Sequence, residues 1–92
     1  MSVTIGNVEF DRVKYDAGAD VLYLHRGEPA DAVDFDESPE GHHLRFDRDG
    51  HLVGLTIVRP RWLLENESGV TIGLPEPVSL PPAVLSSVLA AA

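Results

Sequence analysis

Alternating apolar and polar residues run through the first part of the chain, and a period of two is typical of strands that bury one face. Residues 3–10 show this alternation on both sides of a Gly-Asn pair, which is suited to a two-residue hairpin turn. Residues 13–15 and 21–25 repeat the pattern on either side of a turn-rich link at 16–20. We therefore expect short antiparallel strands joined by tight turns.

Three more strands are expected before Pro60. Residues 32–36 place two aspartates opposite two apolar side chains, which is typical of an outer, half-solvated strand. Residues 42–47 alternate again. The sequence Asp47-Arg48-Asp49-Gly50 then predicts a hairpin loop, because glycine readily takes the positive φ that such a loop needs. Residues 52–58 are apolar at nearly every position, so we expect this strand in the middle of the sheet.

The chain changes character after Pro60, which ends the strand pattern. Residues 61–66 suit one helical turn or an irregular arm, and a short strand is expected at 70–74. The proline-rich sequence from residue 75 suits an extended connector. Residues 83–92 then space their apolar side chains as one face of a helix does. A helix of this length is unstable alone, so we expect it to dock on its own sheet or on a second copy.

These elements predict a mainly β (α+β) fold, an antiparallel β meander of about five or six strands with one C-terminal helix. The 92 residues suit a single domain. Within it we expect a β meander at 1–58 and an extension at 59–92 that holds the short strand and the helix. Because a domain of this size has a thin margin of stability, we also expect a homodimer.

The acidic charge is concentrated in the first forty residues, which hold ten acidic and three basic residues, and the whole chain carries a net charge of −8. Such a chain lacks the clustered Lys and Arg that nucleic-acid binding needs. It has no cysteine, no basic leader and no long apolar run, so we expect a cytoplasmic protein that does not span a membrane. The acidity either keeps the protein soluble or attracts a basic protein partner.

A further signal comes from particular residues at turn and core positions. They are Tyr15-Asp16, Ala19-Asp20, Leu22-Tyr23-Leu24, Gly41, Leu44, Phe46-Asp47, Gly50 and the run Leu52-Val53-Gly54-Leu55-Thr56-Ile57. This set resembles the bacterial family catalogued as domain of unknown function 2283. The resemblance implies a compact antiparallel β meander and no established catalytic residues. Some relatives are thought to be encoded beside small toxin-like proteins, so it also implies an antitoxin-like or immunity-type role.

Two acidic sequences have the chemistry of a calcium site, and each has a simpler interpretation. Carboxylates at 31–40 suit a hard cation, but period two places Asp34 and Asp36 on an outer strand, where charge discourages pairing between sheet edges. The sequence Asp47-x-Asp49-Gly50 resembles the opening of a calcium loop but lacks the closing acidic residue. We therefore favour a solvated edge and a hairpin loop.

Histidines and serines offer other candidate chemistry. The histidines are His25, His42, His43 and His51. Adjacent His42 and His43 point to opposite faces of a strand, which disfavours a shared zinc ion. The serines lack a Gly-x-Ser-x-Gly sequence, and a small meander has little depth for paired carboxylates. We expect no catalytic residue, no cofactor and no resident metal.

Trp62, flanked by Arg59 and Arg61, is the strongest candidate for a contact surface, because Trp and Arg are enriched at binding hot spots. The alternative is that Trp62 only caps the edge of the core. The predicted interface residues are Trp62, Arg59, Arg61 and, on the C-terminal helix, Leu85 and Leu89. The sequence thus favours a small non-catalytic protein-binding module, an antitoxin-like partner of a small basic protein. The alternative function is a small-ligand or metal-binding enzyme with a site at a subunit interface.

Overall fold

The computed structural model describes residues 2–28, 31–67, 69–73 and 78–92, and all statements on structure refer to these residues. The strands are β1 (Val3–Ile5), β2 (Val8–Phe10), β3 (Arg12–Asp16), β4 (Val21–His25), β5 (Asp34–Glu37), β6 (His43–Phe46), β7 (Leu52–Val58), β8 (Val70–Ile72) and β9 (Val78–Leu80). The helices are α1 (Pro60–Asn66) and α2 (Pro82–Ala91). The predicted mainly β fold with a C-terminal helix is confirmed.

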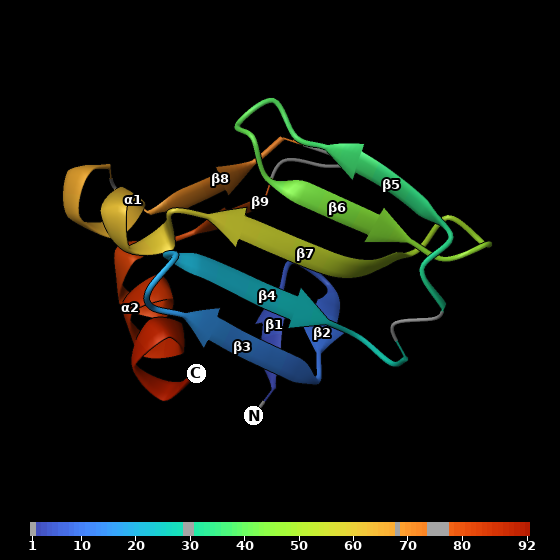
Figure 1. Ribbon diagram of the computed structural model, residues 1–92, viewed down its shortest axis with the longest axis horizontal. Helices are drawn as coiled ribbons and strands as arrows, with labels where there is room; N and C mark the ends of the chain where they lie inside the picture. Colours follow the sequence, from blue (N-terminus) through green and yellow to red (C-terminus); the bar gives the residue numbers. More distant parts are fainter. Residues whose placement is uncertain (1, 29–30, 68, 74–77) are drawn as a thin grey trace.

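Five strands form the main sheet in the order β3-β4-β7-β6-β5, with every neighbouring pair antiparallel (Figure 1). β7 lies in the centre, as its apolar sequence predicts. β5, β6 and β7 form a meander, whereas the chain leaves β4 beside the centre and enters β5 at the far edge. Alternation does not specify this order, because period two determines the face a residue takes and not which strands become neighbours.

Two glycines at positive φ form turns that the sequence predicted. Gly6, with a φ of 63°, and Asn7 connect β1 to β2 as a two-residue turn. Gly50, with a φ of 81°, lies in the loop between β6 and β7. Both hairpins are therefore confirmed.

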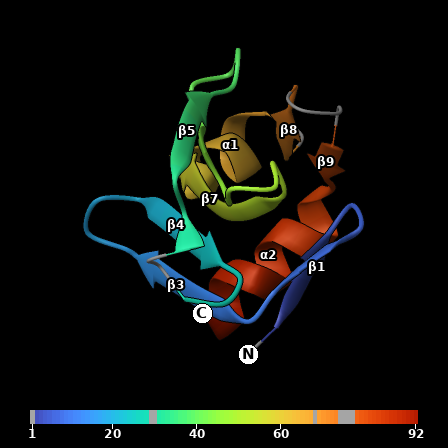
Figure 2. The same ribbon diagram turned by 90° about the vertical axis from the view of Figure 1, so that its right-hand side faces the viewer.

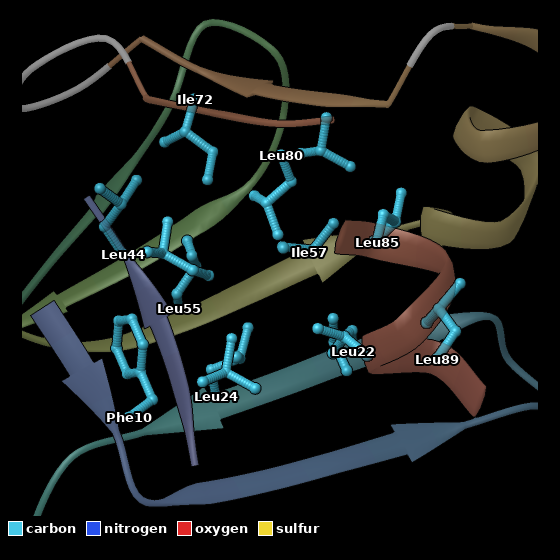
Figure 3. Packing of buried hydrophobic residues seen from close by; sticks show 14 residues of the cluster. Phe10, Leu22, Leu24, Leu44, Leu55, Ile57, Ile72, Leu80, Leu85 and Leu89 are labelled. Carbon is cyan, nitrogen blue, oxygen red and sulfur yellow. The ribbon is translucent and has the colours of Figure 1, made fainter. Parts of the chain in front are cut away.

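One face of the main sheet is covered by the β1–β2 hairpin, the β8–β9 hairpin and α2 (Figure 2). Figure 3 shows the core that they enclose. The core residues that are at most 1% exposed are Phe10, Leu22, Leu24, Leu44, Leu55, Ile57 and Leu85. This cluster joins the sheet to both ends of the chain, since Val3 and Leu89 also belong to it.

The C-terminal helix forms as the apolar spacing predicted. α2 begins at Pro82, where the missing N–H of proline has no cost. Leu85, Val88 and Leu89 are buried, whereas Val84, which falls at the same spacing, is 43% exposed. The buried face packs against the chain's own core, so the helix docks within one copy.

The β8–β9 hairpin differs in part from the expected connector. β8 covers 70–72 of the strand expected at 70–74, and Leu74 lies outside the described residues, as does the connector at 75–77. Residues 78–80 form β9, which pairs antiparallel with β8 and was not expected. A three-residue strand bounded by prolines offers too short an alternation to be recognised.

Neither helix in the described part of the chain has the length and hydrophobicity that crossing a membrane would need.

Candidate functional site

Helix α1 begins beside a turn that lies far away in the sequence. The carboxylate of Asp20, in the β3–β4 turn, accepts hydrogen bonds from the backbone N–H groups of Arg61 (3.0 Å) and Trp62 (3.2 Å). The backbone carbonyl of Asp20 accepts a third from the N–H of Arg59 (2.8 Å). The first N–H groups of a helix have no partner within the helix, so Asp20 caps α1 in place of a neighbouring side chain.

Both sides of this contact have a left-handed backbone. The φ angle is 53° at Asp20 and 58° at Arg59, and neither residue is a glycine. This conformation costs about 1–2 kcal/mol in residues with a Cβ. It persists where surrounding contacts hold it, and here the three hydrogen bonds of Asp20 do so.

Tyr15 completes the network. Its hydroxyl donates to Asp20 Oδ1 (2.7 Å) and accepts a hydrogen bond from Arg61 Nε (3.3 Å). Partial burial opposes the charge of Asp20, but the hydrogen bonds from Tyr15 and from two backbone N–H groups outweigh it and hold the pKa of Asp20 below its ordinary value. Burial, together with the hydrogen bond to Asp20, raises the pKa of Tyr15. At neutral pH the carboxylate is therefore charged and the hydroxyl protonated, as this network requires.

Trp62 lies at the surface beside two arginines. Its side chain is 43% exposed, and the Arg59 guanidinium lies 5.0 Å from the centre of its ring. The Arg61 guanidinium lies 5.7 Å from the centre of the Tyr15 ring. We call these four residues, Tyr15, Arg59, Arg61 and Trp62, the Trp62 surface. The structure thus brings three of the predicted interface residues together at the start of α1, which Asp20 caps.

A pocket of about 340 Å³ adjoins the Trp62 surface. Its lining residues are Glu40, Gly41, His42, Val58, Arg59, Leu63, Glu67, Gly69 and Thr71. Arg59 belongs to both features, because it lines the pocket and contacts the ring of Trp62. The Glu40 carboxylate accepts a hydrogen bond from the N–H of Gly73 (2.8 Å), which is the main cause of its lowered pKa. The pocket therefore combines two carboxylates with one guanidinium.

His42 is the buried polar group of this pocket, with only 2% of its surface exposed. Its Nδ1 accepts a hydrogen bond from the N–H of Val58 (3.1 Å), so in the neutral ring the proton is on Nε2. Burial lowers the pKa of His42, against the opposing charge of Glu40. A neutral histidine that presents an N–H donor can orient a ligand, and such perturbed groups in pockets are common at binding sites.

The two acidic segments that were considered as calcium sites form a hairpin loop and an outer strand. Asp47 Oδ1 accepts hydrogen bonds from the N–H groups of Asp49 and His51, both at 2.9 Å, which closes the hairpin loop. The possible ligand atoms of these three residues lie within 4.8 Å of one another on the surface. β5, which carries Asp34 and Asp36, is an edge strand with all four residues exposed. The hairpin loop and the outer position of β5 are confirmed. The strand is not half-solvated as predicted, because Phe35 on its apolar side is 67% exposed.

The two predicted interface residues of the C-terminal helix lie elsewhere. Leu85 is fully buried and Leu89 is 5% exposed, and both belong to the core that joins α2 to the main sheet. In this structure they stabilise the chain's own fold, and the Trp62 surface does not include them.

Sequence reasoning missed Asp20 and the pocket position of His42. Asp20 is 41 residues away from Arg61, so no local capping pattern reveals the contact. The sequence predicted only that His42 and His43 point to opposite faces. The pocket forms where the loop before β6, the end of β7, α1 and β8 meet. The left-handed φ of Arg59 has no sequence signal either, since arginine seldom takes it.

Comparison with known proteins gives one positive result. No curated protein and no solved structure shows significant similarity to the chain. A family model described as Protein of unknown function (DUF2283) matches residues 12–59, just over half of the chain and the segment from β3 to the end of β7. The chain therefore belongs to the DUF2283 family, whose function is unknown.

Proposed function

We propose that this chain is a small non-catalytic protein-binding module whose contact surface is centred on Trp62. The observation that carries the proposal is a 43% exposed tryptophan between two arginines on a helix fixed by Asp20. Trp and Arg dominate binding hot spots. A side chain that is already held in place also loses less conformational entropy on binding than a mobile one.

The proposed partner is a small basic protein, bound in an antitoxin-like manner. The net charge of −8 speeds the encounter with a basic surface. Glu40 and Glu67 line the pocket beside Trp62 and offer carboxylates to a Lys or Arg side chain of the partner. The Arg61 guanidinium lies over the Tyr15 ring, and Arg59, which lines the pocket, lies beside the Trp62 ring.

The test compares the wild type and two variants as baits for capture from native cells. Trp62→Ala removes the centre of the surface, whereas Val84→Ala trims an equally exposed apolar residue on α2. We expect one small basic protein to be recovered with the wild type and with Val84→Ala, and to be lost with Trp62→Ala. Equal recovery with all three baits would overturn the proposal. Since Trp62 is the only tryptophan, its emission should also shift to shorter wavelength when the recovered protein is added.

The pocket around His42 supports a second candidate, a small-ligand site of the kind an enzyme would need. A buried neutral histidine facing Arg59 and two carboxylates suits a small molecule that carries both an acidic and a basic group. Native mass spectrometry of the purified protein distinguishes the two functions. A bound metabolite that is lost in His42→Asn favours the second candidate, and an empty wild-type protein that still captures a basic partner favours the first.

A further inference from the structure

The second face of the main sheet carries no helix or strand of the described residues, and we call it the open face (Figures 1 and 2). Cross-strand pairing places its residues in two rows that cross all five strands and a shorter third row of Asp16, Val21 and Val58. The first row runs from edge to edge through Lys14, Tyr23, Thr56, His43 and Glu37. The second row runs through Arg12, His25, Gly54, Arg45 and Phe35.

The two edges of the open face each carry a charge that has no ion-pair partner in the described chain. The β3 edge presents Arg12, Lys14 and Asp16, and Arg12 is paired with Glu28 (3.2 Å). Arg12 and Lys14 border a shallow hollow of about 400 Å³, which Asp11, His25 and Arg45 also line. The β5 edge presents Glu37. Among the described residues neither Lys14 nor Glu37 forms an ion pair, so these two are the complementary charges that the face offers to a second copy.

The open face also has exposed aromatic rings that suit further contact. Phe35 is 67% exposed and Tyr23 is 41% exposed. Two polar atoms on this face, Thr56 Oγ1 and His25 Nε2, have no hydrogen-bond partner among the described residues, but both are already buried within the chain. The apolar contact surface for a partner is therefore supplied by the rings of Phe35 and Tyr23.

The edge of β5 itself is closed to an added strand. Ser38 N–H donates across to the carbonyl of His42 (2.8 Å), and backbone alternation then directs the N–H groups of Phe35 and Glu37 outward. Each is already bonded to a carboxylate, Phe35 N–H to Asp34 Oδ1 (3.0 Å) and Glu37 N–H to Asp36 Oδ1 (2.8 Å). A partner is therefore expected on the face of the sheet and not along its edge.

We propose that a second copy of this chain docks on the open face, with a two-fold axis parallel to β7. Rotation about that axis lays the β3 edge of one copy over the β5 edge of the other, so that Lys14 meets Glu37 of the second copy, twice. An axis across the strands would instead bring Lys14 onto Lys14 and Glu37 onto Glu37. Like charges placed together are unfavourable, so charge selects the first arrangement.

The chosen arrangement also uses the exposed rings. Arg12 of one copy lies opposite Phe35 of the other, which allows a cation–π contact. Thr56 and Gly54, in the centre of the face, lie near the axis. The side chains of Arg45 and His25 pack over Gly54, so these side chains would meet the second copy there. Five strands of four to seven residues give a flat footprint of roughly 400 Å². This is a small interface, so we expect dimerisation in the micromolar range.

The test is sedimentation velocity of the full chain at rising concentration. The wild type should pass from monomer to dimer, and either Lys14→Glu or Glu37→Lys alone should weaken dimerisation about tenfold or more through like-charge contacts. Glu9→Lys and Arg48→Glu make the same charge changes at exposed positions away from the open face and should dimerise as the wild type does. Circular dichroism confirms that each variant is folded.

Mixing the two single variants gives the sharpest result. Lys14→Glu has a carboxylate at both positions 14 and 37, and Glu37→Lys has an ammonium group at both, so a 1:1 mixture should form heterodimers although neither variant dimerises alone. A wild type that stays monomeric at several hundred micromolar would overturn the proposal. So would a dimer that both single variants leave unchanged, or a mixture that fails to restore it. These results are independent of whether Trp62 binds a basic protein.

Discussion

The two faces of the main sheet are built from the same strands, but one face is buried in the core and the other is open. On β4, Leu24 is 1% exposed and its neighbour Tyr23 is 41% exposed. On β7, Leu55 packs into the core, whereas Thr56 faces the open side with an unpartnered hydroxyl. The difference arises from the segments that cover one face only, since the strands supply residues to both faces in equal number.

Those covering segments lie outside the family match. The match at residues 12–59 contains the five strands of the main sheet, and β1, β2, β8, β9 and α2 all fall before or after it. Phe10 and Leu85, which are fully buried, come from these flanking segments. The matched segment therefore supplies the sheet with its apolar face, which carries Leu22, Leu24 and Leu55, and in this chain the flanking segments cover that face.

Removing part of the cover should have the largest effect. Phe10→Ala takes a fully buried ring from β2 and leaves a cavity against the sheet, so we expect the free energy of unfolding to fall by about 4 kcal/mol. Urea denaturation monitored by circular dichroism measures the change. Glu9→Ala, at the exposed neighbouring position, is the control and should change stability by less than about 0.5 kcal/mol. A small loss for Phe10→Ala would show that the cover contributes little.

A pair of variants on β4 compares the two faces directly. Leu24→Ala should cost about 3 kcal/mol, because its side chain is buried. Tyr23→Ala removes a larger side chain but should cost about 1 kcal/mol or less, because that side chain is already in contact with water. The midpoints of urea unfolding, taken at a concentration where the protein is monomeric, measure the loss of stability in each variant. Equal losses would mean that the open face is packed as tightly as the core.

Sequence reasoning succeeded where structure is local. The turns at Gly6 and Gly50 and the helix from Pro82 follow from short patterns, because backbone geometry and helical spacing are set by near neighbours. It failed where contacts are distant. The pairing of β4 with β7 and the capping of α1 by Asp20 join segments that no alternation relates.

The candidate site shows the same division. Trp62 and its arginines could be chosen from residue type alone, since all three are adjacent or nearly so in the sequence. Their rigidity could not, because it depends on Asp20 and Tyr15 from another hairpin. Likewise, period two predicted opposite faces for His42 and His43, but the burial of His42 in a pocket with Arg59 and Glu67 depends on segments that lie far apart in the sequence.

Two substitutions of Asp20 should cause losses of stability of intermediate size, and together they separate the contribution of the carboxylate from that of the left-handed backbone. Asp20→Gly keeps the left-handed φ at no strain but removes the carboxylate, so we expect a loss of about 2 kcal/mol. Asp20→Ala should lose about 1 kcal/mol more, because alanine is strained at a φ of 53°. Thermal or urea unfolding at neutral pH measures both losses. Equal losses for the two variants would show that backbone strain at position 20 does not contribute.

The contribution of Asp20 should also depend on pH. Its folded-state pKa lies below the ordinary value of 3.8, so the stabilisation is fully present above that value and is lost as the pH falls through the folded-state pKa. The difference in stability between the wild type and Asp20→Gly should therefore shrink in acid. A difference that stays constant would mean that the carboxylate acts without its charge.

The smallest expected effect is that of His42, which should make the free energy of unfolding depend on pH. Burial holds its folded-state pKa below the ordinary value of 6.5. Above 6.5 the ring is neutral in both states; below it the unfolded chain takes up a proton that the folded chain does not, so stability falls as the pH drops from 6.5 toward the folded-state pKa. The slope for one proton is at most about 1.4 kcal/mol per pH unit.

His42→Asn should remove that slope while keeping an acceptor for the N–H of Val58. His43→Asn, on the exposed side of the same strand, is the matched control and should retain it. Urea unfolding across this pH range distinguishes the two variants. If both keep the slope, the pH dependence arises elsewhere and the ring of His42 is not shielded. If only His42→Asn loses it, the pocket excludes the charged ring, and a ligand that enters it meets a neutral donor.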